Sequence, residues 1–284
     1  MKPRILDFDG SVLTLPNERR MALHSRQESI RFGCRLPALQ AFDKAASHML
    51  SAEPDPVFMG SGDYHHLSYL LIMRYAALGR PIQVVVLDNH PDNMRYPWGI
   101  HCGSWVHHVS RLPFVAQVNV LGITSTDVEV FRSWENHLRN LHSGKVRYWC
   151  IGRDLGWMNA MGIRQSHSFD SCGDLIEAFH THLKATSMPI YLSIDKDVLS
   201  PEDVRTNWDQ GVMRLEEMRQ LIALMQGRII ASDITGEVSV YDYKSRFKQM
   251  LSALDDQPEI SKEQLAEWQA GQQRANLQLL EWLV

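Results

Sequence analysis

The apolar segment 84–87 is followed by three side chains that can bind a metal ion: Asp88, His90 and Asp92. Positions two apart on an extended backbone face the same way, so these side chains would converge just past a strand end. Without a cation, neighbouring carboxylates repel each other and one of them must hold a proton. Carboxylate oxygens with an imidazole suit Mn²⁺ or Zn²⁺ better than Ca²⁺. Because this spacing alone is a weak signal, a turn-capping Asp88 with a surface His90 is the alternative.

A second apolar segment, 189–194, ends in Asp195 and Asp197. If both segments are strands of one parallel sheet, their ends open on the same edge, where ligands bind in open α/β sheets. Four carboxylates exceed what one ion needs, and they suit two ions about 3.5–4 Å apart that activate a water between them.

Residues 57–66 predict a strand, a glycine-rich turn and a helix that begins near His65, which offers a further imidazole. The glycines there are not spaced as in a phosphate-binding loop.

In their order along the chain, these motifs resemble those of the arginase/agmatinase (ureohydrolase) family. The family's D-A-H-x-D motif is similar to residues 88–92, its S-x-D-x-D motif to residues 193–197, and its G-G-D-H motif to residues 61–65 with Tyr64 inserted. The insertion leaves His65 and His66 as alternatives, and the position of Leu67 favours His65.

The resemblance implies a pair of Mn²⁺ ions, with Zn²⁺ as the alternative metal. Asp88 and Asp195 would bridge the ions. One ion would be held by His65, Asp88, Asp92 and Asp195, and the other by Asp88, His90, Asp195 and Asp197.

The resemblance also implies catalytic and substrate-binding residues. His101, in the segment 99–103, would shuttle protons at the rim of the site. Asp92 or Asp197 would position the attacking water. Glu237, in a segment similar to the family's D-I-V-E, would bind the guanidinium of the substrate.

The segment 205–211 departs from the glycine- and threonine-rich substrate loop of the family. The predicted metal ligands are intact while this part of the pocket wall differs. Asn207 and Trp208 are therefore candidates for substrate contact, together with Glu237, and the substrate need not be arginine or agmatine.

Predicted strands alternate with predicted helices along the chain, which indicates a parallel sheet covered on both faces. We therefore predict one domain over residues 1–284, with a three-layer αβα architecture and a mostly parallel central sheet, as in arginases and deacetylases. Residues 11–35 are polar and predict a long loop. Helices are expected at 36–50, 65–78, 103–112, 127–141, 171–185, 215–226 and 261–283.

The composition of the 284-residue chain, 44% hydrophobic and 22% charged, is ordinary for a soluble globular protein. A net charge of −4 offers no basic surface for nucleic acid. The four cysteines lack C-x-x-C spacing, which favours a reducing cytoplasm over a disulfide framework. No segment predicts a signal peptide or a membrane span. The resemblance implies that the protein forms a homo-oligomer. It also implies that the substrate is a small molecule with a guanidino or amidino group.

Three functions are compatible with the sequence. The first is a binuclear manganese hydrolase in which a hydroxide bridging the ions attacks the carbon of a guanidino or amidino group. The second is a deacetylase-like amidohydrolase on the same fold, with one tightly held ion. The third is a non-catalytic metal-binding relative, motivated by the altered segment 205–211.

Overall fold

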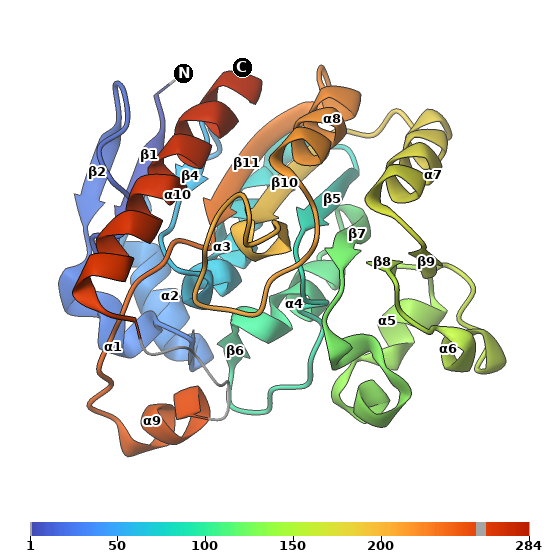
Figure 1. Ribbon diagram of the computed structural model, residues 1–284, viewed down its shortest axis with the longest axis horizontal. Coiled ribbons are helices and arrows are strands. Elements are labelled where there is room, and N and C mark those ends of the chain that lie inside the picture. Colours follow the sequence, from blue (N-terminus) through green and yellow to red (C-terminus); the bar gives the residue numbers. More distant parts are fainter. Residues whose placement is uncertain (1, 254–259, 284) are drawn as a thin grey trace.

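The computed structural model describes residues 2–253 and 260–283, and its centre is a twisted parallel sheet (Figure 1). Within the described residues the sheet has nine strands, in the order β2-β1-β4-β11-β10-β5-β7-β8-β9, and every neighbouring pair is parallel. The strands are β1 (Arg4–Asp7), β2 (Arg19–Ala22), β4 (Val57–Phe58), β5 (Ile82–Leu87), β7 (Val115–Ile123), β8 (Val146–Ile151), β9 (His167–Phe169), β10 (Ile190–Asp195) and β11 (Ile229–Thr235). A separate antiparallel pair joins β3 (Gly33–Cys34) to β6 (Ile100–His101).

Helices lie on both sides of the sheet, as Figure 1 shows. They are α1 (Gln27–Ile30), α2 (Leu36–Ala45), α3 (Ser68–Met73), α4 (Trp105–Ser110), α5 (Leu138–His142), α6 (Gly156–Ala160), α7 (Cys172–Lys184), α8 (Leu215–Met225), α9 (Arg246–Ala253) and α10 (Lys262–Trp282). Ser261 is the N-cap of the long α10, and its side chain and that of Gln264 cap each other's backbone.

The hydrophobic core has two parts because successive strand residues face opposite sides of the sheet. On β5, Val84 and Val86 pack into the cluster that contains side chains of α2, α3 and α4. Val85 and Leu87 pack into the opposite cluster, with side chains of α7, α8 and α10. The predicted three-layer αβα fold with a parallel sheet is confirmed.

Several predicted elements differ from the observed ones. The predicted helix 127–141 is wrong, because that segment forms 3-10 turns at Thr126–Val128 and Val130–Glu135 before the short α5. The predicted loop 11–35 contains β2, α1 and β3. The predicted helix 65–78 is a 3-10 turn over Gly62–Leu67, then α3, then a 3-10 turn that ends at Gly79 with φ +71°. Gly79 takes this left-handed conformation without steric cost.

The strands that matter for function are neighbours in the middle of the sheet. Strands β4, β11, β10 and β5 lie side by side and run the same way, so their carboxyl ends open on one edge. Among the helices of the described residues, none combines the length and the apolar character that crossing a bilayer requires.

Candidate metal centre

The first half of a candidate metal-ligand cluster surrounds His65, which lies in the 3-10 turn after β4. Its Nδ1 atom is 3.1 Å from Oδ2 of Asp88, 3.2 Å from Oδ2 of Asp92 and 3.5 Å from Oδ2 of Asp195. Its other ring nitrogen, Nε2, lies 2.9 Å from Oγ of Ser193. All of these side chains are buried.

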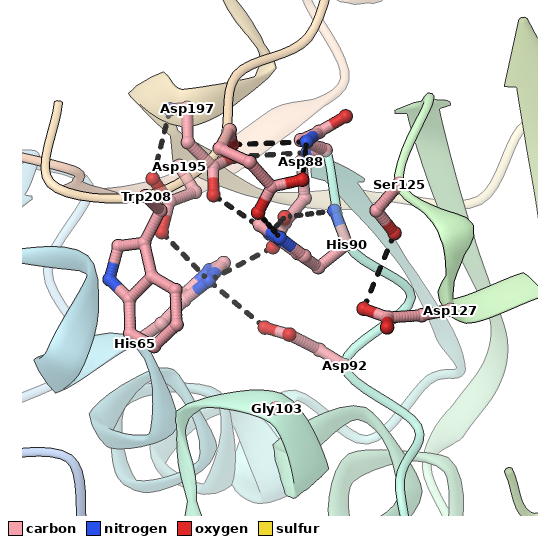
Figure 2. Close-up of polar contacts among 12 residues, drawn as sticks. His65, Asp88, His90, Asp92, Gly103, Ser125, Asp127, Asp195, Asp197 and Trp208 are labelled. Atoms are coloured by element: carbon pink, nitrogen blue, oxygen red, sulfur yellow. Dashed lines mark hydrogen bonds and ion pairs between the residues drawn. The ribbon is translucent and has the colours of Figure 1, made fainter. Parts of the chain in front are cut away.

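The second half of the cluster surrounds His90, just beyond the end of β5. Nδ1 of His90 lies 2.9 Å from Oδ2 of Asp197 and 3.5 Å from Oδ1 of Asp88. Nε2 of His90 lies 2.8 Å from Oδ1 of Asp209. Asp88 therefore belongs to both halves, as Figure 2 shows.

Local backbone geometry fixes the carboxylates at the strand ends. The amide of His90 donates to Oδ1 of Asp88 at 2.6 Å, and the amide of Asp197 donates to Oδ1 of Asp195 at 3.0 Å. Asp92 has φ +46°, a left-handed backbone conformation that residues other than glycine rarely adopt. Trp105, in α4, holds it there by donating its indole N–H to Oδ2 of Asp92 at 2.6 Å. Strain of this kind gathers at functional sites.

The charges of the cluster shift its pKa values in opposite directions. Burial raises the pKa of Asp92 to about 7 and that of Asp195 to about 6, and the charge of Asp88 adds to both shifts. Burial opposes a low pKa for Asp88, but the neighbouring rings of His65 and His90 outweigh it and hold that pKa below its usual range. Protons therefore offset part of the negative charge, and a metal ion replaces protons when it binds such ligands.

The cluster settles which of the neighbouring histidines faces the carboxylates. His65 points into the cluster, as predicted, whereas His66 does not. Both ring nitrogens of His66 are buried without a hydrogen-bond partner among the described residues. Burial lowers the pKa of His66 well below its usual value, so this ring is a neutral core side chain.

The donor atoms fit a bound cation. Ser193 donates its hydroxyl to Asp233 at 2.7 Å, so its oxygen accepts the Nε2 proton of His65. In a neutral His65 ring, Nδ1 then carries a lone pair, and this lone pair faces carboxylate oxygens. Nδ1 of His65 and Oδ2 of Asp88 are also buried without hydrogen-bond partners among the described residues. Lone pairs that converge in this way require a positive charge between them, either a proton or a metal ion.

A cavity of about 570 Å³ opens above the cluster. It is within the range of about 300–1,000 Å³ that is usual for small-molecule sites. The predicted substrate residues Asn207 and Trp208 both line it, as does His101. The segment 205–211 thus forms part of the cavity wall.

His101 lies in the cavity wall as a neutral imidazole. Its Nδ1 accepts the backbone N–H of Gly103 at 2.9 Å, so Nε2 carries the proton. Burial lowers the pKa of His101 to about 3. The position agrees with the predicted role at the rim, but a ring of this pKa is a hydrogen-bond donor through Nε2 and a poor carrier of protons at neutral pH.

The structure places Glu237, which the sequence predicts to bind the substrate, outside the cavity. Its carboxylate is 1% exposed, does not line the cavity, and forms an ion pair with Lys196. Asn276, in α10, donates to the same carboxylate oxygen at 2.7 Å. Lys196 stands between Asp195 and Asp197 and is fully buried, and a buried ammonium group requires a charged partner.

Sequence reasoning missed Asp209 and the polar role of Trp105. Trp105 is fully buried in the core, and its N–H also holds Asp92. Asp209 lies in the altered segment 205–211. A carboxylate in that segment was the feature of the sequence that could have marked it as a site residue. Nothing in the sequence places it beside His90, because the contact joins segments far apart in the chain.

A known protein family matches most of the chain. The model of the arginase family matches residues 23–253. The chain belongs to the arginase family. The resemblance inferred from its motifs is therefore confirmed. A curated protein of Thermotoga maritima, described as an uncharacterized protein, is 26% identical over 239 residues, which cover 82% of this chain and 78% of that protein.

Solved structures of arginase-family enzymes share the fold. Arginase from Bacillus subtilis superposes with a TM-score of 0.56 at 14% identity, covering 99% of this chain and 97% of that one. Proclavaminate amidino hydrolase from Streptomyces clavuligerus superposes with a TM-score of 0.54 at 17% identity, covering 99% of this chain and 92% of that one. Formimidoylglutamase from Bacillus subtilis superposes with a TM-score of 0.52 at 14% identity, covering 96% of this chain and 72% of that one. The chain thus has the fold of arginase-family hydrolases.

Proposed function

We propose that this protein is a metal-dependent hydrolase that cleaves a C–N bond in a small guanidino or amidino compound. The observation that carries the proposal is the matching orientation of His65 and His90. Each turns Nδ1 toward carboxylates that include Asp88, while Ser193 or Asp209 holds Nε2. Two ligand groups that share one carboxylate suit two divalent ions, as in binuclear hydrolases.

The ligands proposed for the two ions are His65, Asp88, His90, Asp92, Asp195 and Asp197. Mn²⁺ is the proposed metal, with Zn²⁺ as the alternative, because the set is rich in oxygen and contains imidazole. Such ions, when bound, supply Lewis acidity and lower the pKa of water toward neutrality.

The protein's own side chains would orient the reacting groups. Trp105 occupies Oδ2 of Asp92, which leaves Oδ1 as the acceptor that positions a water. His101 presents its Nε2 proton as a hydrogen-bond donor at the cavity wall. Trp208, which lies beside Gly62 in the cavity wall, would limit the access of bulk water.

The test combines metal content with turnover. Purified protein is saturated with Mn²⁺, its metal content is measured by mass spectrometry, and guanidino and amidino compounds are screened for release of urea, formamide or ammonia. We expect two ions per chain and release of one of these products. Saturation at one ion would favour the deacetylase-like alternative, and two ions without any product would favour a non-catalytic relative.

A matched pair of variants assigns the metal to this cluster. Asp88→Asn removes the carboxylate that both ligand groups share, so we expect loss of both ions. Asp170→Asn makes the same chemical change at an exposed position outside the cavity and should retain both. Full metal content in Asp88→Asn would contradict the proposed site.

A further inference from the structure

Five aromatic rings form a continuous wall from the metal-ligand cluster to the mouth of the cavity. Trp208 stacks on Phe32 with centroids 6.3 Å apart, and Phe32 stacks on His101 at 5.9 Å. Tyr96 meets His101 edge-on at 4.3 Å and Trp98 at 5.4 Å. All five residues line the cavity. We call these rings the aromatic wall.

The wall begins at the cluster and ends in solvent. A Cβ atom added to Gly62 would lie 2.9 Å from Oδ2 of Asp195 and 3.0 Å from Cδ1 of Trp208, so the indole lies beside the carboxylates, as Figure 2 shows. At the other end, Trp98 is 55% exposed. A substrate whose reacting group lies at the cluster would therefore extend along the rings toward the opening.

The backbone around Phe32 is built to hold its ring in this wall. Phe32 has φ +67°, a left-handed conformation that is costly for a bulky side chain. Two backbone hydrogen bonds fix it: its N–H donates to Asp63 at 2.9 Å, and its carbonyl accepts from Cys102 at 3.0 Å. The next residue must be small, because a Cβ on Gly33 would lie 2.5 Å from Cβ of His101. The strained backbone at Phe32 thus places its ring against the ring of His101.

Two polar side chains of the cavity wall, Asn207 and Arg132, are already partnered within the protein. The amide of Asn207 exchanges hydrogen bonds with the backbone of Ser239 at 2.8 and 2.7 Å. Arg132 is paired with Asp127 at 2.7 Å. Glu237 lies outside the cavity altogether. Ring faces are therefore the main surface offered to the part of a substrate that extends away from the cluster.

We propose that the substrate of this site carries a planar aromatic group attached to its guanidino or amidino group, and that Phe32 and its neighbours in the aromatic wall select that group. The proposal rests on the proposed function, which supplies the reacting group. Stacking of one aromatic ring on another adds to the free energy of burial, and ring faces also attract cationic groups. A flexible polar chain gains no benefit from stacking on these rings.

The test compares ligands that differ only in the group placed on the wall. Binding to the full-length, Mn²⁺-saturated protein is measured by calorimetry for 2-phenylethylguanidine, 2-cyclohexylethylguanidine and n-butylguanidine, with ligand integrity checked by mass spectrometry. We expect the phenyl compound to bind about tenfold more tightly than the butyl compound, and more tightly than the cyclohexyl compound of similar size. Equal affinities for phenyl and cyclohexyl compounds would overturn the proposal.

Variants locate the preference on the wall. In Phe32→Leu the preference for phenyl over cyclohexyl should fall to near unity, with Mn²⁺ affinity unchanged. Phe169→Leu is the matched control, because Phe169 lies in β9 outside the cavity, and it should keep the preference. If Phe32→Leu fails to fold, Tyr96→Leu tests the same wall through the ring that contacts His101. A preference unchanged in the folded wall variant would also overturn the proposal.

Failure of this inference and failure of the proposed function give different results. Hydrolysis of n-butylguanidine without any preference for the phenyl compound would refute the aromatic subsite and leave the hydrolase. A phenyl preference that is lost in the wall variant, with no hydrolysis of any compound, would support the subsite and count against the hydrolase.

Discussion

Oδ1 of Asp209 lies 2.8 Å from Nε2 of His90, so the segment 205–211 contacts a predicted metal ligand directly. The same residue accepts from the side-chain amide of Asn89 through its backbone carbonyl at 3.0 Å. A carboxylate on the outer nitrogen of a histidine fixes the tautomer that presents the inner nitrogen to a metal. The altered segment has therefore kept a link to the cluster.

Asp209→Asn is expected to weaken Mn²⁺ binding by about 10–100-fold, because a neutral amide replaces the charged carboxylate that accepts the Nε2 proton of His90 and orients its ring. The affinity for Mn²⁺ is measured by isothermal titration calorimetry. Glu202→Gln removes the same charge at an exposed position near the segment and should leave the affinity unchanged. Equal losses in both variants would point to net charge rather than to the contact with His90.

Gly62→Ala is expected to disturb both the cluster and Trp208. The added Cβ would lie 2.9 Å from Oδ2 of Asp195 and 3.0 Å from Cδ1 of Trp208, so one of them must shift. Overpacking of this kind costs about 1–3 kcal/mol of folding free energy, and Mn²⁺ affinity should fall as well. Denaturant unfolding and metal titration measure the two effects. Gly173→Ala in α7 meets only Ser171 Oγ at 3.7 Å and serves as the control.

Lys196→Met is expected to destabilise the fold, because it leaves the carboxylate of Glu237 buried without its cation. Breaking a buried ion pair from one side costs about 3–5 kcal/mol, whereas replacing both partners with apolar residues is often tolerated. The double variant Lys196→Met/Glu237→Leu should therefore recover much of the loss in urea unfolding. Glu216→Gln, in an exposed pair, should change little. A double variant no more stable than the single one would contradict this account.

His101 is expected to stay neutral across the physiological pH range. Burial lowers its pKa to about 3 in the folded protein, while the unfolded value is about 6.5. Below pH 6.5 the unfolded chain binds the proton and the folded chain does not, so this residue makes the protein less stable as the pH falls, by up to about 1.4 kcal/mol per pH unit.

Two measurements check the prediction for His101. The ring nitrogen resonances of His101 should not titrate between pH 8 and 5. The loss of stability on acidification below pH 6.5 should be smaller in His101→Gln than in the parent protein. A ring that titrates near pH 6.5 would instead support the proton shuttle predicted from the sequence.

The sequence by itself determined where the candidate ligands lie. Asp88, His90, Asp195 and Asp197 follow apolar strands, and side-chain alternation with a parallel sheet places such residues on one edge. These are local rules, so pattern alone was sufficient for β5 and β10 and for the residues that follow them.

Only the tertiary structure decided which side chains face each other across the fold. His65 rather than His66, Glu237 with Lys196, and Asp209 with His90 each depend on contacts between segments far apart in the chain. The aromatic wall is the clearest case, since its rings come from segments near residues 32, 96–101 and 208. Local spacing sets the direction in which a side chain leaves its own strand or turn, but its partner is set by packing and by the need of buried charges to be paired.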